Sequence, residues 1–244
     1  GSVSRVRSQK RGIASPIVSG GFHNIDTLIG GIAGDSLTGI DDVAAWEVDG
    51  TNRYSTSGST IDEAHYLFFN SFENLNGGIV DDTFRIIGAP QTVNLSGNDG
   101  NDQFILIGNG SVNGTINGGN DFDSFDLSNK TTAQSISISN LISIENLIGT
   151  AFIDTLLGLN SATTFVIDGP DSGTAGTIGF TGFENLQGGT SGDSFEFLDG
   201  GSISGSVNGG TGSDALRFTD MSSSQQITLT GLGTNDGFAG NAGA

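Results

Sequence analysis

The chain has 244 residues and is rich in glycine, with 41 Gly, 3 Pro and no Cys. The lack of Cys excludes disulfides and thiolate metal sites, and two His cannot form a three-His metal centre. Charged residues are only 14% of the chain, yet the net charge is −19. The helix formers Lys, Arg and Glu together number 14, too few for a helical bundle. Apolar residues make up 34%, including 16 Phe, which favours a folded core over disorder.

The first segment, residues 1–20, is predicted to be a basic leader. It contains half of the basic residues and no acidic one, and its charges are Arg5, Arg7, Lys10 and Arg11. The rest of the chain carries four basic and 27 acidic groups, which repel nucleic acid and anionic membranes. We therefore expect no nucleic-acid partner and no membrane insertion. The leader is either a loose tail or a self-assembly element that binds the acidic body of its own or a neighbouring chain.

Residues 21–244 are predicted to form a single repetitive domain of two large copies, at about 25–143 and 144–244. The segment FENLNGGIVDDTF (72–84) returns as FENLQGGTSGDSF (183–195). The absence of an initiator Met and of a signal peptide leads us to expect a processed chain or a fragment.

The spacing within the copies indicates short structural turns. The first copy has 20 additional residues, at 85–104, inserted without disturbing the flanking pattern. Acidic residues recur at the same interval: Asp82, Asp102 and Asp123 are 20 and 21 positions apart. A period near 20 is typical of a solenoid, in which each turn buries its apolar face against its neighbours.

The local pattern predicts strands. Segments 115–128, 135–144 and 195–210 alternate polar and apolar residues and are bounded by Gly and Asn. We predict an all-β fold, a right-handed parallel β-helix (β-solenoid) with turns of about 20 residues, its handedness following from the general crossover rule. The alternative is an antiparallel β-sandwich pair, against which the clean one-turn insertion argues.

Two further positions bear on this prediction. Residues 53–71 are eight positions longer than their counterpart in the second copy, and we expect them to form a projecting loop. Trp46 and Phe165 occupy the same repeat position, which predicts core residues rather than a sugar-stacking platform.

The glycine-rich corners suggest calcium as a ligand. GGTGSDALR (209–217) fits the nonapeptide G-G-x-G-x-D-x-hydrophobic-x, whose Asp and backbone oxygens suit Ca²⁺. The candidate calcium ligands, in neighbouring corners, are Asp99, Asp102, Asp121, Asp123, Asp193 and Asp214. The competing interpretation is that each Asp caps its own corner through a local backbone hydrogen bond. Calcium is therefore a candidate ligand, and no cofactor is required.

The sequence offers little support for an enzyme. A polysaccharide-active β-helix needs paired carboxylates or a basic residue beside an acidic cluster. Only Arg53, Arg85, Lys130 and Arg217 are basic outside the leader, and neither His has a Ser or Cys partner that the pattern places nearby. We find no nucleophile elbow, phosphate loop or zinc motif, and we expect no catalytic residues.

The repeated phrases FENLNGG, FENLQGG, IENLIG and SVNGGTGSDALRF resemble the β-helical repeat regions of large bacterial secreted surface proteins. These include filamentous-haemagglutinin-like adhesins, autotransporter passengers and RTX-type adhesins, and the resemblance covers about residues 22–240. It implies secretion to the bacterial cell surface or beyond and a structural or adhesive role, with a surface glycan or protein as target. The basic leader and the degraded glycine–aspartate repeats depart from that pattern.

Neither end of the sequence has the pattern of a β-helix cap, so we expect exposed strand edges that stack on another chain or on neighbouring repeats. The predicted function is a non-catalytic β-solenoid, an adhesin stalk module or a self-assembling fibre subunit. The alternatives are a calcium-binding RTX-like domain and a polysaccharide-active β-helix enzyme.

Overall fold

The computed structural model describes residues 21–56, 58–234 and 237–243, so the basic leader lies outside the described residues. The described chain is built from β-strands, with one short 3-10 turn, η1 (Ile138–Asn140). It divides into two compact units. The first runs to Lys130 and includes Ile142–Ile144, and the second contains Thr131–Leu141 and the residues from Glu145 onward.

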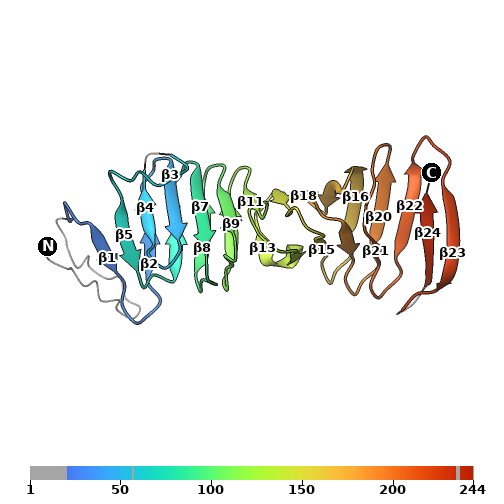
Figure 1. Cartoon of the computed structure of the whole chain (residues 1–244), viewed down its shortest axis with the longest axis horizontal. Coiled ribbons are helices and arrows are strands. Elements are labelled where there is room, and N and C mark those ends of the chain that lie inside the picture. The colour runs from blue at the N-terminus through green and yellow to red at the C-terminus, as the bar shows by residue number, and fades with distance from the viewer. Residues whose placement is uncertain (1–20, 57, 235–236, 244) are drawn as a thin grey trace. The chain divides into compact units, whose positions relative to one another are not determined.

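In the first unit the strands form two sheets (Figure 1). The main sheet has the order β1-β5-β4-β3-β7-β9-β11, and the second sheet has the order β2-β6-β8-β10. From β6 onward, consecutive strands alternate between the two sheets. The strands are β1 (Thr27–Ile29), β2 (Ser36–Thr38), β3 (Ala44–Val48), β4 (Arg53–Ser55), β5 (Leu67–Asn70), β6 (Asn74–Asn76), β7 (Asp82–Ile87), β8 (Asn94–Asn98), β9 (Gln103–Ile107), β10 (Ile116–Gly119) and β11 (Ser124–Asp126).

The second unit has the same kind of arrangement. Its main sheet has the order β14-β18-β17-β16-β20-β22, its second sheet the order β12-β15-β19-β21, and β23 and β24 form a separate hairpin. Strand β13 (Leu141–Ile142) is divided between the units. The other strands are β12 (Ser135–Ser137), β14 (Asn146–Ile148), β15 (Thr155–Leu157), β16 (Thr164–Gly169), β17 (Ser172–Ala175), β18 (Ile178–Thr181), β19 (Asn185–Gln187), β20 (Ser194–Leu198), β21 (Val207–Asn208), β22 (Ala215–Asp220), β23 (Gln226–Leu232) and β24 (Phe238–Gly243).

The parallel strands pair with the spacing that the sequence predicts. Phe84 lies opposite Phe104, 20 positions on, and Phe104 lies opposite Phe125, 21 positions on. Leu75 and Leu95 are paired in the second sheet at the same spacing. The prediction of an all-β fold with long, mostly parallel sheets is therefore confirmed, and the pairing is consistent with a solenoid-like fold.

Stacked aromatic rings form the centre of the core. The rings of Trp46 and Phe84 lie parallel with centroids 5.4 Å apart, and those of Phe84 and Phe104 are 5.0 Å apart. In the second unit Phe165 stacks on Phe195 at 4.8 Å. All five side chains are buried, so the prediction that Trp46 and Phe165 are core residues is confirmed. In-register pairing places like side chains above one another, which favours this offset stacking.

The loop expected at residues 53–71 is limited to the connection between β4 and β5. The two strands extend the main sheet by antiparallel pairing, which the sequence did not predict. Tyr54 explains the difference, because its ring packs 4.4 Å from that of Trp46 and its hydroxyl accepts a hydrogen bond from the Ile40 N–H. The second unit has the same antiparallel insertion, formed by β16, β17 and β18.

The repeat spacing leads to a deletion test. Removing residues 85–104 joins Phe84 to Ile105, so that Phe84 takes the place of Phe104 above Phe125. We expect a cooperatively folded protein with a modest loss of stability, because each turn of a repeat array contacts only its neighbours. Far-UV circular dichroism and urea unfolding measure this. Removing residues 85–94 alone is the control. It breaks the register and should abolish cooperative unfolding, and equal tolerance of both deletions would contradict the account.

Candidate functional site

The most regular polar feature is a set of aspartates at the corners that lead into strands, which we call the corner aspartates. Each lies immediately before a strand or at its first position, and each follows a glycine five positions earlier. The corner aspartates are Asp35, Asp82, Asp102, Asp123, Asp154, Asp193 and Asp214. Five of them are at most 2% exposed, so their side chains lie inside the fold rather than on its surface.

At five of the seven corner aspartates, Oδ1 accepts a backbone N–H from the preceding turn. The Asp82 N–H donates to Asp102 Oδ1 at 2.7 Å, and the Asp102 N–H donates to Asp123 Oδ1 at 2.7 Å. In the second unit the Asp193 N–H donates to Asp214 Oδ1 at 2.8 Å. The carboxylates therefore link successive turns along a column, and each one fixes the register of the strand that follows the corner.

At four corners, those of Asp35, Asp82, Asp154 and Asp193, Oδ2 accepts a backbone N–H of the corner itself. Asp82 Oδ2 accepts the N–H of Gly78 at 2.7 Å, and Asp193 Oδ2 accepts the N–H of Gly189 at 2.7 Å. Such local hydrogen bonds satisfy backbone donors that the turn leaves unpaired. At these corners the aspartate therefore caps its own turn, as the competing interpretation in the sequence analysis predicts. The same column of aspartates also links successive turns.

The glycine five positions before each corner aspartate makes room for the carboxylate. A Cβ on Gly97 would meet Asp102 Oδ2 and the carbonyl oxygen of Gly118 closer than van der Waals contact. A Cβ on Gly118 would meet Asp123 and the carbonyl oxygen of Ser143 in the same way. Neither glycine has a positive φ. The motif therefore requires Gly for close approach between turns, whereas the sequence suggested only tight turns.

At Asp35 and Asp154, the backbone N–H donates to a glutamate of the repeated FENL phrase instead of to another corner aspartate. Glu73 Oε2 accepts the Asp35 N–H at 2.8 Å, and Glu184 Oε2 accepts the Asp154 N–H at 2.7 Å. The adjacent Asn side chain donates to the carbonyl of the same aspartate, as in Asn74 to Asp35. Sequence reasoning missed this role, although the repetition of Glu and Asn in FENL was its signal.

Burial raises the pKa values of two corner aspartates, Asp82 and Asp102. Removal from water raises the pKa of Asp82 to about 6 and that of Asp102 to about 7, from an ordinary value of 3.8. The Asp82 N–H bound to Asp102 opposes the shift, and the neighbouring charges of Asp123 and Asp82 add to it. Burial therefore makes Asp82 and Asp102 protonate at a higher pH than an exposed aspartate does.

The structure separates the six predicted calcium ligands into two groups. Asp102, Asp123, Asp193 and Asp214 are corner aspartates, whose Oδ1 atoms accept backbone N–H groups where they face a preceding turn. Asp99 and Asp121 lie outside the column and are exposed; Asp99 accepts from the Asn120 amide and Asp121 from the Gly100 N–H. Within the described residues, no three His, Cys, Asp or Glu side chains are grouped to hold a metal ion.

The four predicted self-assembly residues, Arg5, Arg7, Lys10 and Arg11, lie outside the described residues.

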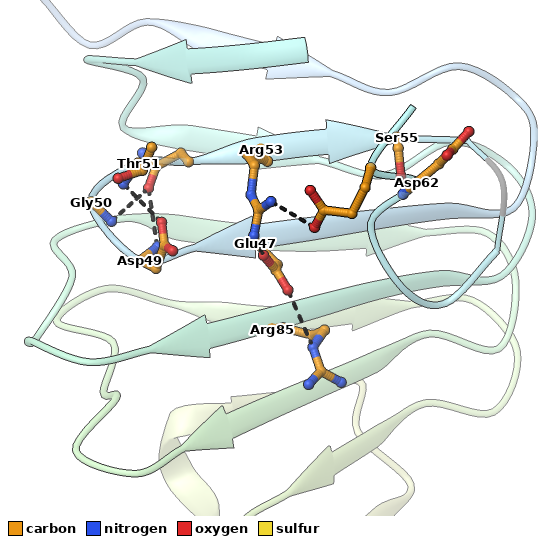
Figure 2. A network of polar contacts seen from close by, with 10 residues as sticks. Glu47, Asp49, Gly50, Thr51, Arg53, Ser55, Asp62 and Arg85 are labelled. Carbon is orange, nitrogen blue, oxygen red and sulfur yellow. Dashed lines mark hydrogen bonds and ion pairs between the residues drawn. The ribbon is translucent and has the colours of Figure 1, made fainter. Parts of the chain in front are cut away.

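A second polar cluster lies over β3, β4 and β7 (Figure 2). Arg53 on β4 binds Glu47 on β3 and Glu63 in the loop 56–66, the latter at 2.9 Å. Arg85 on β7 approaches Glu47 with Nε 3.8 Å from Oε1. Glu47 therefore lies between two guanidinium groups on a half-buried surface. These ion pairs connect the antiparallel strand β4 to the parallel strands β3 and β7.

The two remaining basic residues of the described chain are also engaged. The Lys130 ammonium is buried and donates to the Gly110 carbonyl at 2.6 Å, and burial lowers its pKa. Arg217 lies 3.6 Å from Glu196 and also donates to Ser194. Arg53, Arg85, Lys130 and Arg217 are thus all engaged in contacts within the fold.

No protein-family model, no curated protein and no solved structure matches the chain. In the part of the chain that the structure describes, no helix has the length and apolar character needed to cross a membrane. Functional inference therefore depends on the geometry of the corners and of the strand edges.

Replacing Gly97 with Ala tests the steric requirement. The new Cβ would overlap the Asp102 carboxylate and the Gly118 carbonyl, so we expect a loss of about 1–3 kcal/mol in the free energy of unfolding. Gly34→Ala is the matched control, because a Cβ there meets nothing within 4 Å, and its effect should stay within about 0.5 kcal/mol. Urea unfolding of both variants decides the point, and equal effects would refute the close approach.

The pKa values of Asp82 and Asp102 predict how stability depends on pH. Because the fold favours the protonated carboxyls, the folded chain binds more protons than the unfolded chain between pH about 4 and about 7. This contribution is fully present below pH about 4, and it is lost as pH rises through 6 and 7. The urea midpoint should therefore fall across this window.

Asp102→Asn, which stays neutral, should reduce that fall. Asp41→Asn is the control, since it removes the same charge from an exposed position and should leave the pH profile of the midpoint unchanged. A wild-type midpoint that rises from pH 4 to 7, or an Asp102→Asn profile identical to wild type, would contradict the assignment.

Proposed function

We propose that the chain is a right-handed parallel β-helix with a structural, non-catalytic role, as a stalk module of a bacterial adhesin or a subunit of a self-assembling fibre. The observation that carries the proposal is the corner-aspartate column, in which carboxylates bind the backbone of the preceding turn. These side chains contribute cohesion along the stacking direction, which is the mechanical property that a stalk or a fibre needs.

The polar clusters support a non-catalytic role. Arg53 and Arg85 both pair with Glu47, and Lys130 binds a backbone carbonyl. A polysaccharide-active enzyme would instead present acidic and basic groups to a substrate groove. The secreted, cell-surface location and a surface glycan or protein target follow from the resemblance of the repeats to bacterial surface proteins.

Calcium remains an alternative ligand at the exposed pair Asp99 and Asp121, and the proposed function does not require it. Ca²⁺ takes six to eight oxygen ligands, whereas Asp102 Oδ1 already accepts the Asp82 N–H and Asp82 Oδ2 already accepts the Gly78 N–H. A chelator should therefore leave assembly and folding unchanged, and a loss of either in EDTA would favour the calcium-binding alternative.

The role also includes extension by stacking, with neighbouring repeats of a longer chain or with further copies of this one. Unpaired strand edges template the pairing of another chain. The basic leader, residues 1–20, has the charge to bind an acidic neighbour, since the remaining residues carry four basic and 27 acidic groups. Such contacts weaken with salt, because the Debye length falls to about 3 Å at 1 M.

Negative-stain electron microscopy tests this function. We expect rows of particles joined end to end in the purified chain, and shorter rows when residues 1–11 are removed or when salt is raised, because the leader no longer binds its neighbour. If the full chain and the variant without residues 1–11 both gave isolated particles at every concentration, the fibre would be contradicted. The proposal would then reduce to a stalk module of a longer chain.

A further inference from the structure

Strand β2 in the first copy of the repeat corresponds to β15 in the second. Residues 25–37 (IDTLIGGIAGDSL) match residues 144–156 (IENLIGTAFIDTL) at an offset of 119, which places β2 and β15 at equivalent positions. The backbone supports this alignment, because Asn24 and its counterpart Ser143 both have a positive φ, of 55° and 47°. The surroundings of β15 therefore indicate what β2 requires.

The second unit shows which strand precedes β15. Strand β12 pairs with it in parallel, with Ser135 opposite Thr155. The Gln134 N–H donates to Asp154 Oδ1 at 2.6 Å, and the Thr155 N–H donates to the Gln134 carbonyl at 2.9 Å. The offset of 119 relates Gln134 and β12 to residues 15–18 of the same chain, which lie outside the described residues.

Strand β2 has the corner of β15 but lacks a second partner among the described strands. Asp35 accepts the Gly31 N–H, as Asp154 accepts the Thr150 N–H. Within the described residues β2 pairs only with β6, and no group donates to Asp35 Oδ1. The three residues of β2 are exposed, half-buried and exposed, whereas those of β15 are half-buried, buried and half-buried. The described part of the chain thus leaves uncovered the edge of β2 that corresponds to the edge of β15 covered by β12.

Two N–H groups of β2 point toward this edge. The Gly39 N–H donates to the Asn76 carbonyl of β6 at 2.9 Å. Because successive N–H groups along a strand point to opposite edges, those of Thr38 and Ser36 face away from β6. The Thr155 N–H, at the position equivalent to Ser36, binds the chain at the start of β12. Strand β2 therefore presents the donors that a parallel partner needs.

The sequence of residues 15–18 (SPIV) fits such a partner. Its two β-branched residues favour a strand. Pro16 corresponds to Ser135, whose neighbour Gln134 directs its N–H and carbonyl toward β15 and its corner. The N–H of residue 135 therefore points to the outer edge, and strands accept Pro where the missing N–H faces outward. Pro16 thus costs no hydrogen bond to β2.

We propose that β2 takes residues 16–18 of its own chain as its second parallel partner, in the register of β12 on β15. Ile17 then lies opposite Leu37, and the Ser15 N–H donates to Asp35 Oδ1. The pair supplies the donor that the described residues do not provide to Asp35, and it covers the half-buried Leu37. This contact within one chain goes beyond the proposed stalk or fibre role and does not depend on it.

The pair closes an edge that otherwise templates the pairing of other chains. Its new outer edge carries Pro16, which offers no N–H, so a further strand pairs poorly there. The contact also fixes where the basic leader begins, because Arg11 lies four positions before Ser15, at most about 14 Å of extended chain. Residues 15–18 thus act as a built-in cap of β2 that holds the positive charges beside it.

The natural absence of Cys permits a test by disulfide trapping within one chain. The proposed register places Val18 opposite Thr38, with Cα atoms about 4.8 Å apart, within the roughly 7 Å that a disulfide spans. Val18→Cys and Thr38→Cys are combined in the full chain, and circular dichroism verifies the fold. The matched control combines Val18→Cys with Ser36→Cys, which is also exposed and lies two positions away, at about 8 Å.

After mild oxidation of dilute protein, we expect at least ten times more disulfide within the chain for the 18/38 pair than for the 18/36 pair. Mass spectrometry of the linked peptides measures this ratio. Equal or negligible trapping of the two pairs would overturn the proposal. A disulfide between two chains in its place would overturn it too, since β2 would then take its partner from a second copy.

Amide hydrogen exchange gives a second measurement, without added thiols. Removing residues 1–20 should raise the exchange rates of the Ser36 and Thr38 amides at least tenfold relative to that of the Phe104 amide, whereas removing residues 1–11 should leave them unchanged. No change after the longer deletion, or an equal increase after both, would overturn the strand pair. Neither readout depends on end-to-end rows in electron microscopy, so the fibre can fail while the cap holds.

Discussion

The hydrogen bond between a corner carboxylate and the backbone N–H of the preceding turn is the contact on which the structure depends. It forms between turns 20 or 21 residues apart, as in Asp82 with Asp102 and Asp102 with Asp123. A buried carboxylate is costly unless it is hydrogen-bonded, and a buried N–H is costly unless it has an acceptor. Each contact pairs one carboxylate oxygen with one N–H, and a shift of register by one residue would break this pairing.

Other features of the chain follow from this contact. Glycine is needed where the carboxylate folds back against the backbone, as at Gly97 and Gly118. The aromatic side chains of successive turns then fall above one another, so Phe84 stacks on Phe104.

The strand content and the period near 20 were predictable, because alternation and repetition depend only on local order in the sequence. The core positions of Trp46 and Phe165 were predictable for the same reason. The strands β4 and β5 were not, since they are three and four residues long and are stabilised by Tyr54 packing on Trp46. Nor did the sequence indicate which Asp oxygens face the backbone, because this depends on contacts between turns, and the exposed pair Asp99 and Asp121 looked equivalent to the buried ones.

Amide hydrogen exchange tests the role of the corner aspartates most directly. The N–H groups of Asp82, Asp102 and Asp193 all donate to carboxylates of other turns. They should exchange only when the surrounding unit unfolds, with protection equal to that of neighbouring strand amides such as Phe104. Exchange of these three amides at the rate of exposed loop residues would show that the carboxylates do not hold the turns in register.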